Sequence, residues 1–163
     1  MTEILYSPWR MEYINSQKED GCIFCLEHPE KEDEKHLILY RSEYSFVIMN
    51  MYPYNNGHLM VIPKRHISSL LSLNDDERND LFALVQKTTG IIEEYYHPDG
   101  INIGMNIGKA AGAGIDEHIH VHIVPRWSGD VNFMTSIGEV RVIPEKFENA
   151  YQRLKELFDK LHD

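Results

Sequence analysis

Polar and hydrophobic residues alternate from His118 to Ile123, within the segment from Glu117 to Pro125 that reads Glu-His-Ile-His-Val-His-Ile-Val-Pro. Successive side chains of a β-strand point to opposite faces, so this pattern predicts a strand with apolar side chains on one face and His118, His120 and His122 on the other. Solvent-facing strand positions favour Thr, Lys and Glu over histidine. Imidazoles in register therefore indicate coordination, proton transfer or nucleophilic attack.

The same kind of pattern predicts further elements on both sides of this strand. Runs rich in β-branched and aromatic residues, bounded by turn residues, predict strands at 36–40, 44–49, 58–63 and 101–106. Asn74 and Glu77 have the spacing of a helix capping box, and apolar side chains then recur on one helical face until His97-Pro-Asp-Gly100 ends the helix. A second amphipathic helix is predicted at 144–162. This order of elements predicts an α+β fold.

Length and composition indicate one globular domain. The chain has 163 residues, 42% of them hydrophobic and 26% charged, which suits a single core at 1–163. We divide it into an N-terminal arm at 1–21, a motif-bearing core at 22–127 and the C-terminal helix at 144–162. The formal net charge of −10 argues against general binding to nucleic acids or anionic membranes. Neither a membrane span nor a secretory signal is evident, so we expect a cytoplasmic protein.

Two further segments carry candidate chemistry. Cys22 and Cys25 form a Cys-x-x-Cys pair, which in a reducing compartment indicates metal or redox chemistry rather than a structural disulfide. Gly108 to Gly114 is a small-residue loop whose backbone amides could approach an anion, although such turns are also common between strands.

The segment His118-Ile-His-Val-His-Ile-Val124 resembles the signature of the histidine triad family. Upstream residues resemble the family's second block in order and spacing: Asn50, Pro53, Gly57, His58, Pro63 and His66. The flanks, Trp9-Arg10, Pro125-Arg-Trp127 and Gly129-Asp130, are most similar to the branch that hydrolyses or phosphorolyses diadenosine polyphosphates. The resemblance implies a five-stranded antiparallel sheet, a long helix, a C-terminal helix and a homodimer.

The resemblance also implies roles for the histidines. His120 would attack the α-phosphorus of a nucleotide and form a nucleotidyl-imidazole intermediate, which water or phosphate later resolves. A main-chain carbonyl would hold its tautomer, because a neutral imidazole attacks only through the nitrogen without a proton. His122 would bond the phosphoryl oxygens and help the leaving group depart. His58 would support the triad from the neighbouring strand.

Substrate contacts follow from the same resemblance. Asn50 would bind ribose hydroxyls, Asn106 would face the phosphates, and Ile48 and Met60 would line the base pocket. Where the family commonly carries Gln followed by Ser or Thr, this chain has Ala113-Gly114-Ile115 and one extra residue. The backbone amides of Gly112, Ala113, Gly114 and Ile115 would then replace the missing hydroxyl.

Trp127 directly follows the histidine strand, and we place it at the mouth of the pocket. There its indole would stack on a base or close over the phosphate chain. The alternative is an ordinary core or dimer-interface tryptophan, because large aromatic side chains are enriched in both places.

Four residues match the zinc ligands of metal-containing family members: Cys22, Cys25, His66 and His118. Two thiolates and two imidazoles make a closed tetrahedral set, so the zinc would be structural. Two reduced thiols without metal are the alternative. We expect no organic cofactor.

Three other functions stay open. The chain could be an adenosine 5'-phosphoramidase of the same family, or a regulatory protein that binds nucleotide or zinc without turnover. The alternating histidines could also hold a catalytic metal, but one of them already belongs to the closed set.

Overall fold

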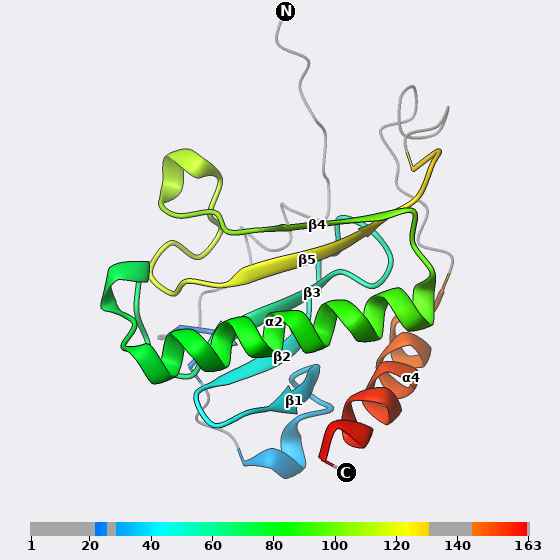
Figure 1. Cartoon of the computed structure of the whole chain (residues 1–163), viewed down its shortest axis with the longest axis horizontal. Helices are drawn as coiled ribbons and strands as arrows, with labels where there is room; N and C mark the ends of the chain where they lie inside the picture. Colours follow the sequence, from blue (N-terminus) through cyan, green and yellow to red (C-terminus); the bar gives the residue numbers. More distant parts are fainter. Residues whose placement is uncertain (1–21, 26–28, 131–144, 163) are drawn as a thin grey trace, which may run out of the picture.

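Antiparallel strands in the order β1-β2-β3-β5-β4 form a five-stranded sheet at the centre of the molecule (Figure 1). The computed structural model describes residues 22–25, 29–130 and 145–162. The strands are β1 (Ile38–Arg41), β2 (Ser45–Met49), β3 (Leu59–Pro63), β4 (Gly100–Gly104) and β5 (Val121–Arg126), and the helices are α2 (Asp75–Tyr96) and α4 (Phe147–Asp159). Short 3-10 helices are η1 (Glu30–Glu32), η2 (Leu70–Ser72), η3 (Lys109–Ala111) and η4 (Lys160–His162). The predicted α+β class and order of elements are confirmed.

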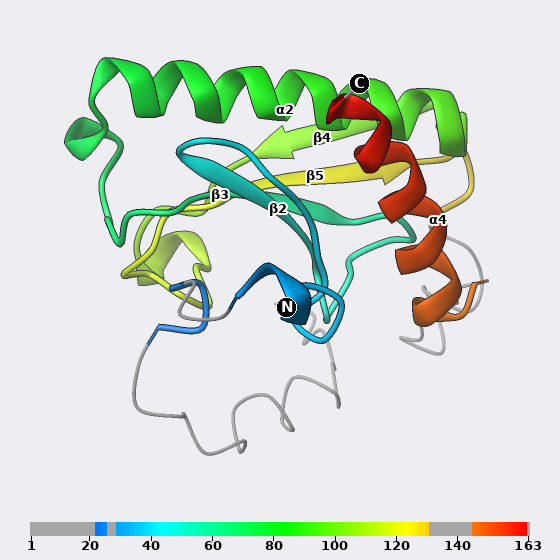
Figure 2. The same ribbon diagram turned by 90° about the horizontal axis from the view of Figure 1, so that it is seen from below.

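The sheet has one face covered by helices, called here the helix face. α2 packs on β2, β3 and β5, and α4 packs on β1. Strand alternation sends Val47, Val61 and Ile123 into this main core. The opposite side, called here the histidine face, holds a smaller buried cluster that includes Phe24, Phe46 and Met60. Figure 2 shows α2 on one side of the sheet and the Cys22–Cys25 segment, with η3, on the other.

The histidine strand is shorter than the alternation predicted. β5 begins at Val121, so His118 and His120 lie on the segment that enters it. The ladder between β3 and β5 ends at the pair Val61 and Val121, because Pro63 has no N–H to continue it. The N–H of Ile119 instead donates to the main-chain carbonyl of Ile67 (2.8 Å). His118 and His120 are both buried.

The remaining boundaries differ from the predictions by a few residues. β3 begins one residue after His58, and β4 ends two residues before Asn106. The predicted arm at 1–21 and the first residue of the predicted helix at 144–162 lie outside the described residues. Within the part of the chain that is described, none of the helices is long and apolar enough to cross a membrane.

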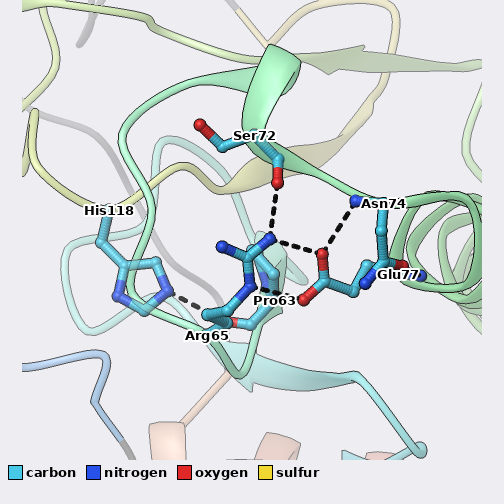
Figure 3. Close-up of polar contacts among 6 residues, drawn as sticks. All are labelled: Pro63, Arg65, Ser72, Asn74, Glu77 and His118. Atoms are coloured by element: carbon cyan, nitrogen blue, oxygen red, sulfur yellow. Dashed lines mark hydrogen bonds and ion pairs between the residues drawn. The ribbon is translucent and has the colours of Figure 1, made fainter.

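A bidentate ion pair fastens the start of α2 to the loop that follows β3 (Figure 3). Arg65 donates from Nε and Nη2 to the two carboxylate oxygens of Glu77, at 2.6 Å each. Glu77 also completes the predicted capping box, because it accepts from the N–H of Asn74 (3.0 Å) while the Asn74 side chain accepts from the N–H of Glu77 (2.9 Å). The loop between these residues carries His66, so the same contacts hold that imidazole in place.

This ion pair predicts a pH-dependent contribution to stability. The Arg65 guanidinium, with the Asn74 N–H, lowers the pKa of Glu77 from 4.5 to about 2. A carboxyl with a depressed folded-state pKa stabilises the fold above the unfolded-state pKa and loses that effect as pH falls through the folded one. The difference in free energy of unfolding between the wild type and Glu77→Gln should therefore shrink between pH 4.5 and pH 2. Urea titrations across this range measure it, and a constant difference would contradict the assignment.

Candidate active site

The first triad histidine is turned away from the other two by a main-chain carbonyl. His118 Nε2 lies 2.8 Å from the carbonyl oxygen of Pro63. A carbonyl only accepts, so Nε2 carries the proton and Nδ1 keeps its lone pair. Nδ1 lies 3.3 Å from Cys22 Sγ and 4.0 Å from Cys25 Sγ. His118 is therefore oriented as a ligand toward the cysteines.

Four side chains form a cluster that could hold a metal ion. The donor atoms of Cys22, Cys25, His66 and His118 all lie within 4.8 Å of one another, and His66 Nδ1 is 3.4 Å from Cys25 Sγ. The turn that brings the cysteines together is closed by the N–H of Cys25, which donates to the carbonyl of Cys22 (3.0 Å). A fixed second nitrogen, as in His118, is the usual arrangement around a metal-ligating imidazole. The predicted grouping of these residues is confirmed.

His120 has the opposite tautomer from His118. Its Nδ1 lies 2.9 Å from the carbonyl oxygen of His118, so Nδ1 carries the proton and Nε2 has a free lone pair. Burial lowers the pKa of His120. The ring is therefore neutral at pH 7 and has one unprotonated nitrogen, which a nucleophile requires.

His58 and His122 form a directed hydrogen-bond relay. The N–H of Tyr54 donates to His58 Nδ1 (3.0 Å), so the proton of this neutral ring must lie on Nε2. Nε2 lies 3.0 Å from His122 Nδ1 and donates to it. Burial, with a smaller effect from His120, lowers the pKa of His122 to about 4. Neutral His122 therefore carries its proton on Nε2 and can donate it.

Two aromatic residues that the sequence reasoning missed complete this group of rings. Phe24, between the two cysteines, packs against His120 with ring centroids 5.1 Å apart. Tyr54 packs on His58 at 4.8 Å and on His122 at 5.9 Å, and about half of it is exposed (48%). Phe24 could have been found from its position inside Cys-x-x-Cys, because the turn that presents two ligands also aims the residue between them.

The predicted base-pocket residues lie in one row with His122. Met60 pairs with His122 across β3 and β5, and Ile48 pairs with Met60 across β2 and β3. Both side chains belong to the apolar cluster of the histidine face. Gly104 pairs with His122 from the other side, and a Cβ added there would meet no atom within 4 Å. One end of the row is thus buried and apolar, and the other end, at Gly104, is open. Asn106 follows Gly104 by two residues.

The predicted ribose ligand Asn50 is already in contact with a histidine. Its Nδ2 lies 3.3 Å from His58 Nδ1 and 3.4 Å from His58 Nε2, so it favours neither ring nitrogen, and its Oδ1 accepts from the N–H of Tyr52 (2.9 Å). The side chain therefore lies against the His58 ring, and its contact with a sugar stays a prediction.

The small-residue loop offers fewer free amides than expected. The N–H of Gly112 donates to the carbonyl of Lys109 (3.0 Å), and the N–H of Ala113 donates to that of Gly108 (3.4 Å). The amides of Gly114 and Ile115 donate to no carbonyl in the described part of the main chain. Ile115 packs on the cluster that contains Met60, which places these two amides beside the histidine face.

Trp127 is not brought to the histidines within this chain. It follows the far end of β5, and its ring packs edge-on against Tyr96 of α2 with centroids 6.3 Å apart. The alternation of side chains explains this position. Trp127 follows Val121 and Ile123 by an even number of residues, and those two side chains point to the helix face. The expected place at the mouth of the pocket is therefore not observed, and its role toward substrate stays a prediction.

The relay and the carbonyl contact together predict opposite tautomers at neighbouring histidines. We expect His120 to carry its proton on Nδ1, and His58 and His122 to carry theirs on Nε2, because a fixed acceptor or donor faces one nitrogen of each ring. Nitrogen-15 NMR of the ring nitrogens at pH 7 distinguishes the two forms. Equal tautomer populations at His120, or an Nδ1 proton on His122, would contradict the assignment.

Comparison with known proteins agrees with this geometry. The HIT domain model matches residues 30–129. AP-4-A phosphorylase of Mycobacterium tuberculosis is 42% identical over 159 residues, covering 92% of this chain and 81% of that protein. Bis(5'-adenosyl)-triphosphatase of Dictyostelium discoideum is 37% identical over 89 residues, covering 55% of this chain and 59% of that protein. A zinc-bound histidine triad protein from Mycobacterium smegmatis superposes with a TM-score of 0.61 at 31% identity, covering 77% of this chain and 86% of that chain. This chain therefore belongs to the HIT-domain family, as its alternating histidines predicted.

Proposed function

We propose that this chain cleaves dinucleoside polyphosphates at the α-phosphate through a nucleotidyl-histidine intermediate. The observation that carries the proposal is the carbonyl of His118 against His120 Nδ1 (2.9 Å), which leaves Nε2 as a buried, neutral nucleophile. The similarity to proteins named AP-4-A phosphorylase and bis(5'-adenosyl)-triphosphatase supports the substrate class.

The reaction has two displacements. In the first, the lone pair of His120 Nε2 forms a P–N bond with the α-phosphorus, and the P–O bond to the departing polyphosphate breaks. His122 donates its Nε2 hydrogen to the phosphoryl or departing oxygen, where charge develops. In the second, an oxygen of water or phosphate attacks the same phosphorus and breaks the P–N bond, and the proton of the attacking oxygen passes to His122 Nε2, where it replaces the hydrogen donated in the first. His120 is then neutral again.

The other substrate contacts belong to the same proposal. Ile48 and Met60 would receive a base at the apolar end of the row, Asn106 and the amides of Gly114 and Ile115 would face the phosphates, and Asn50 would reach the ribose. Strand register supports the first of these contacts, because Ile48 and Met60 lie in one row with His122.

Product analysis separates this function from its alternatives. The protein is incubated with diadenosine tetraphosphate, with and without phosphate, and with an adenosine phosphoramidate. AMP release without phosphate indicates hydrolysis, ADP formed only with phosphate indicates phosphorolysis, and cleavage of the phosphoramidate alone indicates a phosphoramidase. Binding of nucleotide without any product would indicate a regulatory protein and would overturn the proposal.

His120→Asn should lower turnover by on the order of 10⁴-fold or more, because Asn has similar size but no nucleophilic ring nitrogen. Nucleotide affinity and thermal stability should change little. His97→Asn is a matched control, since His97 is an exposed C-cap residue of α2 with a left-handed φ of 44° that Asn also adopts readily. Turnover retained by His120→Asn would exclude His120 as the nucleophile.

We propose that Cys22, Cys25, His66 and His118 hold a structural zinc ion. Zn–S bonds of about 2.3 Å and Zn–N bonds of about 2.0 Å in a tetrahedron place sulfur and nitrogen about 3.6 Å apart. The observed Sγ–Nδ1 distances of 3.3, 3.4 and 4.0 Å lie around that value. A closed set of this kind supplies folding energy and no reactive water.

Metal removal should therefore destabilise the protein. Cys22→Ser should abolish stoichiometric zinc and lower the melting temperature by about 10 °C, because a chain of this length loses about 2–4 °C per kcal/mol. Added zinc should not raise turnover of the wild type. Elemental analysis and thermal unfolding measure the two effects, and a wild type purified without chelators that contains no zinc would contradict the assignment.

A cytoplasmic homodimer is part of the same proposal. Among the described residues, β4 has a strand neighbour on one side only, and most of the residues of β4 are exposed, including Ile103 (49%). A second copy could pair with this edge and cover it.

A further inference from the structure

The loop between β2 and β3, residues 50–57, is held at its tip by a side chain from a distant part of the sequence. Asn55 Nδ2 donates to Asp130 Oδ2 (2.7 Å) and to the carbonyl of Pro125 (3.0 Å). Pro125 lies near the end of β5 and Asp130 in the turn that follows, 70 and 75 positions after Asn55. The triad motif and the β-strand periodicity include neither Asn55 nor Asp130.

Asp130 collects several donors on one oxygen. Its Oδ2 also accepts from Arg126 Nε (2.8 Å) and from the N–H of Trp127 (3.0 Å), and only 14% of the side chain is exposed. Hydrogen bonds to an ionised carboxylate are stronger than neutral ones. Asp130 is therefore a fixed anchor, and Asn55 is the residue through which it reaches the loop.

The anchored tip contacts His58 directly. The carbonyl of Asn55 accepts from the main-chain N–H of His58 (3.2 Å), and the preceding residue, Tyr54, supplies the N–H that binds His58 Nδ1. On its other side the loop packs closely on α2, because a Cβ added to Gly57 would lie 2.7 Å from a ring carbon of Tyr96. The loop that carries the Tyr54 amide is thus held at its tip by Asn55 and packed against Tyr96 at Gly57.

We infer that Asn55 and Asp130 are positioning residues that set the tautomers of His58 and His122. With the tip held, the Tyr54 N–H occupies His58 Nδ1, the His58 proton stays on Nε2, and His122 keeps a proton on its own Nε2. With the tip released, His58 Nδ1 can take the proton, and Nε2 then accepts from an Nδ1 proton on His122. Each ring still carries one proton, but His122 Nε2 no longer donates toward the substrate.

The inference about tautomers stands on this geometry, and only its effect on rate rests on the proposed function. Asn55→Asp replaces the donor with a carboxylate facing Asp130 and should release the tip. The double variant Asn55→Asp with Asp130→Asn restores a donor and an acceptor in the reverse sense. It does not restore the bond to Pro125, and an amide nitrogen in place of Oδ2 cannot accept from Arg126 or Trp127, so rescue should be partial. Asp99→Asn is the control, because Asp99 accepts from the N–H of Ser128 in the same turn (2.6 Å) and has no bond to the loop.

Nitrogen-15 NMR of the histidine rings is the first measurement. We expect Asn55→Asp to move protons from Nε2 to Nδ1 in His58 and His122, the double variant to reverse part of that change, and the control to match the wild type. If Asn55→Asp does not fold, Asn55→Ala, which removes the donor without adding a charge, takes its place. Wild-type tautomers in the folded variant would overturn the inference, whatever the activity.

Kinetics with diadenosine tetraphosphate is the second measurement. Loss of a donor to the departing group should lower kcat by about 10- to 100-fold while KM changes little. One outcome is that the tautomers change in the variant while the wild type turns over no dinucleotide. That result would leave the positioning role intact and reject the proposed function. A tautomer change with unaltered kcat in an active enzyme would reject the link between the tautomers and the rate.

Discussion

A buried neutral imidazole has one donor and one acceptor nitrogen, and in this chain main-chain groups determine which is which. The carbonyl of Pro63 turns the lone pair of His118 toward the cysteines, and the carbonyl of His118 turns that of His120 away from its own strand. The Tyr54 N–H acts in the opposite sense and makes His58 a donor to His122. Three similar residues on one segment thereby become a ligand, a nucleophile and a donor. The main chain assigns these roles because burial removes the water that would otherwise let each ring change its tautomer.

The cysteine turn links the ligand cluster to this chemistry. Phe24 lies between the two cysteines, is almost fully buried and packs against both His118 and His120. A metal in the cluster would hold the turn, and the turn would hold Phe24 against the nucleophile and exclude water from it. The Arg65–Glu77 pair holds the remaining ligand loop at the start of α2, so the site is supported from the sheet, a helix cap and the N-terminal turn together.

Much of the fold could be predicted because the responsible signals are local. Apolar periodicity, the Asn74–Glu77 capping box and the order of strands and helices depend on neighbouring residues, and the structure agrees with all of them. The start of β5 could not be predicted, since it depends on Pro63 in another strand. Trp127 was misplaced because the order of residues along the chain suggested a pocket, whereas strand parity decides the face.

The residues of the candidate site also divide into those that the sequence predicts and those that it does not. The clustering of the four ligands and the row of Ile48, Met60 and His122 were expected from the resemblance to the family, whose motifs these residues match. Contacts between loops that lie far apart in the sequence determine the roles of Tyr54, Asn55 and Asp130. No periodic pattern in the sequence predicts such contacts. A carbonyl that holds the tautomer of His120 was expected from the family resemblance, and the carbonyl of His118 takes that place. The tautomers of His58 and His122 were not accessible, because they depend on the Tyr54 amide that lies 3.0 Å from a ring nitrogen.

The central claim is that the tautomer of His120 makes its Nε2 the nucleophile. The most direct measurement is acid-free rapid quenching of the enzyme during turnover of diadenosine tetraphosphate, followed by peptide mapping by mass spectrometry under conditions that preserve P–N bonds. The account predicts one adenylyl group on the peptide that contains His118, His120 and His122, attached at His120. An adenylyl group on His122 or on any other residue would contradict it, as would turnover during which no covalent adduct accumulates even with a slowly resolved phosphorothioate analogue.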